Sequence, residues 1–139
     1  MTPRQKALVR NSWARLQPQA DVLTERFYER VFALSPKTRD LFASKNMRLQ
    51  GSLFTRMLAL FIQSLGDDEP ELLASIGASG RRHVGYGVVF TDYDTVGEAL
   101  LWSVEQTLGR RFTGEVREAW AEAYRSLAAA MRQGSSSIL

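Results

Sequence analysis

The 139-residue chain is long enough for one domain with a sizeable core and too short for two. Hydrophobic residues make up 45% of it and charged residues 24%, a balance that is typical of a globular protein and argues against a disordered one. The net charge is +3, but the basic residues are dispersed among acidic ones, which favours a mixed solvated surface over nucleic-acid binding. The absence of cysteine excludes disulfides, thiolate metal sites and cysteine nucleophiles, and it is compatible with the cytoplasm, where we expect the protein to reside.

The first half of the chain has the pattern of helices. Apolar residues recur at three- and four-residue spacing, no run is long enough to span a membrane, and no apolar signal core begins the chain, so we predict an all-α domain without a membrane span. Thr2, Pro3 and Gln5 form a helix start, because Thr2 can cap, Pro3 fits the first turn and Gln5 can complete a capping box. Further helices are expected over residues 20–34, 36–42 and 49–65, with a polar loop over 43–48.

Glycine and proline divide the second half in the same way. Pro70 opens a helix that continues to residue 83 and ends at the glycines that follow it. Thr91 or Asp92 caps a long helix that Gly109 closes, and a last helix starts near 114 and carries apolar residues to about 131. We therefore expect about seven helices in a domain over residues 1–133, with 134–139 as a disordered tail or the root of a linker.

His83 is the only histidine in the chain and the first candidate for chemistry. A lone histidine is by default a surface residue or a satisfied core residue. However, His83 lies seven residues after Ile76 on an apolar helix, and a Gly-x-Gly stretch follows it closely and would let the backbone approach a ligand. Ser79, one turn earlier, can accept a bond from Nδ1 and leave Nε2 free for a metal. Without cysteine one histidine cannot build a zinc site, but haem iron needs only one protein ligand.

Two other polar residues stand on apolar helices, Tyr28 and Gln50. Taken alone, Tyr28 is more often the edge of a core with its hydroxyl in water, and Gln50 is more often an exposed residue of a first helical turn. Competing enzyme classes lack support, because the chain has no glycine-rich phosphate motif and no Gly-x-Ser-x-Gly elbow.

Three segments carry a resemblance to a known family. They are FYERVFALSPKTRDLF over residues 27–42, GRRHVGYGVVFTDYDTVGEALLWSVEQTLG over 80–109 and EAWAEAY over 118–124. In combination they resemble a bacterial single-domain globin, similar to the haem domain of flavohaemoglobins, over about residues 4–132. The resemblance implies a globin fold around a haem b pocket.

The resemblance also implies roles for individual residues. His83 matches the iron ligand, and Tyr28 and Gln50 match the distal residues that hydrogen-bond a bound ligand. A one-residue shift in the variable loop before Gln50 would instead put Leu49 and Leu53 in the distal roles. The remaining positions implied to contact the haem are Phe42, Leu53, Phe54, Met57, Arg82, Val88, Tyr93 and Val96.

These roles imply reversible binding of dioxygen and of other diatomic ligands, NO and CO. Two hydrogen-bond donors near a partly negative dioxygen predict slow release, and NO dioxygenation would be possible with an external reductase. Because His83 is alone, the sixth iron site is open, water-bound or taken by a weaker ligand such as Tyr28. The glutamate that relatives carry near Ser135 is missing, which argues against strong peroxidase-like activation. The alternatives are a haem-based gas sensor domain of a larger protein and a haem-free helical interaction module.

Overall fold

Every regular element is helical in the computed structural model, which describes residues 1–67 and 93–136. This confirms the all-α fold class, and the helix predicted between Pro70 and residue 83 lies outside the described residues. The elements are α1 (Pro3–Leu16), η1 (Gln17–Gln19), α2 (Ala20–Leu34), α3 (Pro36–Leu41), α4 (Met47–Asp67), α6 (Tyr93–Leu108), η3 (Gly109–Arg111) and α7 (Gly114–Ser136).

Capping side chains decide where two of these helices begin. The Gln5 N–H donates to Thr2 Oγ1 over 3.1 Å and the Thr2 N–H donates to Gln5 Oε1 over 2.9 Å, which is the predicted capping box. Helix α4 begins two residues earlier than predicted, because the Asn46 side chain accepts from the N–H groups of Arg48 and Leu49. The polar loop predicted over 43–48 is correspondingly shorter.

Helix α7 extends into the segment that we predicted as a tail over residues 134–139. The helix continues to Ser136, three residues past the expected boundary at 133. Residues 137–139, the rest of the predicted tail, lie outside the described residues.

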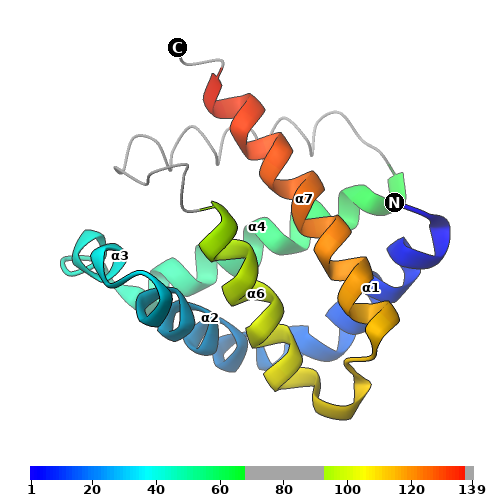
Figure 1. Ribbon diagram of the computed structural model, residues 1–139, viewed down its shortest axis with the longest axis horizontal. Helices are drawn as coiled ribbons and strands as arrows, with labels where there is room; N and C mark the ends of the chain where they lie inside the picture. The colour runs from blue at the N-terminus through cyan, green and yellow to red at the C-terminus, as the bar shows by residue number, and fades with distance from the viewer. Residues whose placement is uncertain (68–92, 137–139) are drawn as a thin grey trace.

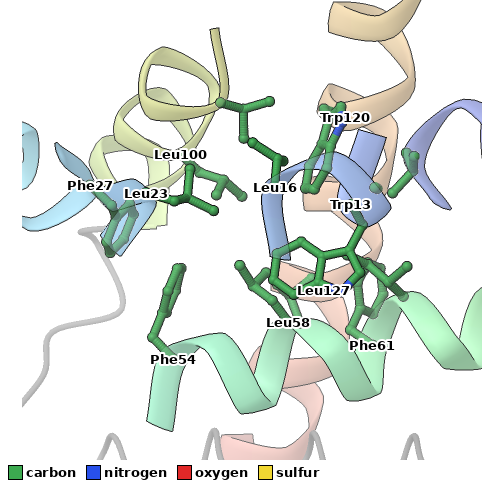
Figure 2. Close-up of a cluster of buried hydrophobic side chains, with 14 of the residues drawn as sticks. Trp13, Leu16, Leu23, Phe27, Phe54, Leu58, Phe61, Leu100, Trp120 and Leu127 are labelled. Atoms are coloured by element: carbon green, nitrogen blue, oxygen red, sulfur yellow. The ribbon is translucent and has the colours of Figure 1, made fainter. Parts of the chain in front are cut away.

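The helices pack around one apolar core. Helix α2 packs mainly against α6 and α1 mainly against α7, while α4 contacts both α1 and α2 and runs behind α6 and α7 in the view of Figure 1. Each amphipathic helix turns its apolar face inward. Figure 2 shows where these faces meet, and the labelled side chains there are Trp13, Leu16, Leu23, Phe27, Phe54, Leu58, Phe61, Leu100, Trp120 and Leu127.

Candidate functional site

Tyr28 lies in a cluster of aromatic rings between α2 and α4. Its side chain is buried, with 8% of its surface exposed. Its ring centroid lies 5.7 Å from that of Phe42 and 6.1 Å from that of Phe54, with edge-to-face geometry in both pairs. Phe27 and Phe32, its neighbours on α2, lie 5.0 Å and 6.1 Å from it. Because edge-to-face contacts are favourable, these rings fix the phenol in an apolar environment.

The Tyr28 hydroxyl interacts with the side chain of Gln50, across the space between the two helices. Burial raises the pKa of Tyr28 to about 12, and the hydrogen bond with the Gln50 side chain has a smaller, opposite effect on this pKa. The phenol therefore keeps its proton at neutral pH and remains a hydrogen-bond donor. Gln50 is half-buried in the first turn of α4. The structure thus brings together two of the residues that the sequence singled out.

Two pairs of residues lie on different sides of α4. Gln50 and Phe54 form the inner pair, and Leu49 and Leu53 form the outer pair. Phe54, one turn after Gln50, is 9% exposed and its ring stacks on that of Phe27 at 4.3 Å. Leu49 is 58% exposed and Leu53 is 48% exposed. The alternative alignment would give the distal roles to these two exposed leucines. Residues four apart share a helix face, so it is Gln50 and Phe54 that form a pair toward Tyr28.

A close crossing of α2 and α4 positions this pair. A β-carbon added to Gly51 would lie 2.9 Å from Thr24 Oγ1, closer than real side chains approach. Only glycine therefore allows the two helices to cross at this distance. The crossing places Gln50, the residue before Gly51, opposite Tyr28, which is one turn after Thr24. Our sequence interpretation missed Gly51 and Thr24, although an isolated glycine within a helical pattern is itself a signal of close packing.

A second close contact fixes the start of α6. Tyr93 begins this helix and is 8% exposed. The hydroxyl of Tyr124 on α7 donates a hydrogen bond to the Tyr93 carbonyl oxygen. Val96 is half-buried against the core in the same turn of α6, and Met57 on α4 is 7% exposed. Tyr124 belongs to the segment over 118–124 that carries the family resemblance, but residue spacing alone does not predict this contact.

A family model described as Globin matches residues 25–131, more than half of the chain. The chain is a globin. Flavohemoproteins from Deinococcus radiodurans and Bordetella pertussis are 30% and 32% identical to it, and each alignment covers 92% of this chain. This globin spans about a third of the length of these relatives, 32% in both cases. They confirm the resemblance to the haem domain of flavohaemoglobins.

A further relative and a solved structure match this globin over nearly their whole length. The neuroglobin of Chaenocephalus aceratus is 29% identical over 96% of this chain and 92% of the neuroglobin. The crystal structure of a hexacoordinated heme protein from an anhydrobiotic tardigrade superposes with a TM-score of 0.88, covering 98% of this globin and 96% of the other chain at 16% identity. The second likeness confirms the globin fold.

Three predicted site residues of this globin lie outside the described residues, namely Arg82, His83 and Val88. Within 1–67 and 93–136, no three His, Asp or Glu side chains are grouped to hold a metal ion. No helix in the same two ranges has the length and apolar character needed to cross a bilayer.

Proposed function

We propose that this globin binds haem b, with His83 as the iron ligand, and reversibly binds dioxygen with Tyr28 and Gln50 as distal donors. The observation that carries the proposal is the burial of the Tyr28 side chain in aromatic surroundings, with the Gln50 side chain as the partner of its hydroxyl. Buried polar groups normally have partners. Two hydrogen-bonding side chains that meet in an aromatic cluster are suited to a small polar ligand.

The residues around Tyr28 fit a haem group. A macrocycle needs apolar walls, and Phe42 and Phe54 provide aromatic surface next to Tyr28. Met57, further along α4, is buried in the same apolar core. The exposed Leu53 adds apolar surface on the neighbouring edge of α4. The chain has no cysteine for thioether attachment, which favours haem b over a covalently bound haem.

When bound, haem iron supplies the reversible attachment of a diatomic ligand. The chain's own contribution on the distal side is the orientation of two donors. Tyr28 keeps its proton well above neutral pH and can donate its O–H, and the amide of Gln50 can donate an N–H. Each hydrogen bond to a partly charged acceptor contributes about 1.5–3 kcal/mol, so we expect slow release of dioxygen.

The likeness to flavohemoproteins supports an extension of this function. We propose that the protein also consumes nitric oxide by dioxygenation in the cytoplasm, with an external reductase restoring the ferrous state. Rapid mixing of the oxygenated protein with NO should give ferric protein and nitrate promptly. Slow or absent oxidation would leave oxygen binding as the function.

Visible spectroscopy of the protein expressed with haem supply tests the central proposal. We expect a Soret band that is lost or displaced in His83→Ala. Tyr28→Phe and Gln50→Ala should each release dioxygen about tenfold faster or more, because each removes one such bond. Leu49→Ala is the matched control on the exposed side of α4 and should leave the release rate unchanged. A colourless protein, or a Soret band unaffected by His83→Ala, would overturn the proposal.

A further inference from the structure

A groove open to solvent follows the outer side of the α2–α4 crossing. Its volume is about 860 Å³, and its lining residues come from η1 and α2 on one side and from α3 and α4 on the other. The Thr24–Gly51 contact lies on its floor. The groove is therefore next to the crossing that positions Gln50, and it shares Tyr28 and Phe32 with the aromatic cluster.

The two rims of the groove carry opposite charges. Asp21, Glu25 and Glu29 stand at four-residue spacing along α2, and Arg48 and Arg56 stand eight residues apart on α4. Among the described residues these five side chains form no ion pair with one another. Opposite charges at hydrogen-bonding distance would bridge the groove and close it. Their separation leaves it open and solvated at the mouth.

Part of the groove lining is apolar, and this part includes Tyr28. Phe32, Met47 and Ala59 are half-buried there, and Tyr28 itself is a lining residue. The ring of Tyr28 also contacts Phe54 in the aromatic cluster. Tyr28 thus belongs both to the lining of the groove and to the aromatic cluster of the candidate ligand site.

We propose that diatomic gases reach the Tyr28–Gln50 site through this groove, past the ring of Tyr28. The proposal rests on the proposed function, since it assigns a passage to the ligands of the same site. Small apolar molecules prefer apolar surfaces to water, and Phe32, Met47 and Ala59 offer such a surface in the groove that Tyr28 also lines. Passage along this route requires the ring of Tyr28 to move transiently within its aromatic cluster. The competing passage leads beside Gln50, along the edge of α4 marked by the exposed Leu53.

Filling the groove with a large side chain tests the route. Thr55 is half-buried on the floor and Ser52 is exposed on the α4 side, and both line the groove. In haem-loaded Thr55→Trp and Ser52→Trp, we expect the association rate of CO after flash photolysis to fall about tenfold, because an added barrier acts exponentially on a rate. A blocked passage slows exit as much as access, so the dissociation rate should fall by the same factor and the equilibrium affinity should stay unchanged.

A matched control distinguishes a blocked groove from a general effect of a tryptophan on the surface of α4. Gln63 is exposed on the same helix and does not line the groove, so Gln63→Trp should keep the wild-type rates. Ser52→Trp needs no repacking and keeps the test decisive if Thr55→Trp fails to fold. Association rates in both groove variants equal to that of Gln63→Trp would overturn the route. A wild-type protein without a Soret band would contradict the proposed function instead, so the two failures are distinguishable.

Discussion

The ring of Tyr124 lies so close to Gly97 that a β-carbon at position 97 would come within 2.5 Å of Tyr124 Cε2. The hydroxyl of the same tyrosine donates a hydrogen bond to the carbonyl oxygen of Tyr93, four residues before Gly97. Ring and hydroxyl together hold α7 against the first turn of α6. This contact holds the backbone of Tyr93, a residue that the resemblance to flavohaemoglobins predicts to contact haem.

Gly97→Ala should destabilise the fold. The added methyl group would overlap the Tyr124 ring. This ring is attached to α7 and its hydroxyl is bonded to Tyr93, so α6 and α7 must separate. Overpacking of this kind costs about 1–3 kcal/mol. Denaturant unfolding of the two proteins gives the difference in free energy of unfolding. Gly114→Ala is the control, because nothing lies within 4 Å of a β-carbon at that position. Equal losses in the two variants would show that the Tyr124 contact does not constrain residue 97.

The buried phenol of Tyr28 should make stability depend on pH in the alkaline range. In the unfolded chain the group ionises near its ordinary value of 10.0, whereas burial raises its pKa in the folded state to about 12. Above pH 10 the unfolded state therefore releases a proton that the folded state retains. The contribution of Tyr28 to the free energy of unfolding is fully present below pH 10. It is lost as the pH rises toward 12, and the free energy of unfolding falls by about 2 kcal/mol over this range.

Denaturant unfolding at a series of pH values from neutral to alkaline measures this effect. The matched variant is Tyr28→Phe, which keeps the ring but has no ionisable group, so the decline in stability should be shallower in it than in the wild type. Parallel pH profiles would mean that the folded-state pKa of Tyr28 is not raised.

Truncation should distinguish the two faces of α4. Phe54 is buried and its ring stacks on that of Phe27, so Phe54→Ala should cost about 3–5 kcal/mol of unfolding free energy. Leu49 is mostly exposed, and Leu49→Ala should change stability by less than about 0.5 kcal/mol. Thermal unfolding followed by far-ultraviolet circular dichroism compares them. A larger loss in Leu49→Ala would favour the alternative alignment, in which Leu49 holds the distal position.

Local sequence signals predicted most of the helices, and the site depended on longer-range information. The capping box of Thr2 and Gln5 needs only neighbouring residues, so the sequence was sufficient to predict it. The start of α4 was predicted two residues late because the capping role of Asn46 was overlooked. The pairing of Tyr28 with Gln50 came from the family resemblance, since helical periodicity does not determine which residues of two helices meet.

The tertiary contacts that hold the site could not be predicted from local patterns. Gly51 was passed over as one residue of an apolar helix, because the need for glycine arises only where Thr24 crosses it. The roles of Gly97 and Tyr124 likewise depend on how α6 and α7 cross. In each case the decisive quantity is a distance between segments far apart in sequence, which residue spacing does not contain.

A further prediction concerns the close contact of Thr24 with Gly51. A side chain at position 51 would clash with the hydroxyl oxygen of Thr24, and a second substitution can remove this atom. Gly51→Ala would bring a β-carbon within 2.9 Å of Thr24 Oγ1, so the helices must shift and Gln50 must move relative to Tyr28. We expect a loss of about 1–3 kcal/mol in stability and faster release of dioxygen. Thr24→Ala removes the obstructing oxygen, together with its hydrogen bond to the Asp21 carbonyl, which is 3.2 Å long.

The double variant Gly51→Ala/Thr24→Ala should therefore be more stable than the sum of the two single losses implies. In double-mutant cycles, residues in direct contact show interaction energies of about 0.5–3 kcal/mol. Here we expect the interaction energy to favour the folded double variant. The dioxygen release rate should return toward the wild-type value in parallel, because relief of the clash lets Gln50 regain its place beside Tyr28. Additive losses, or a release rate that stays high in a stable double variant, would show that the crossing distance does not position Gln50.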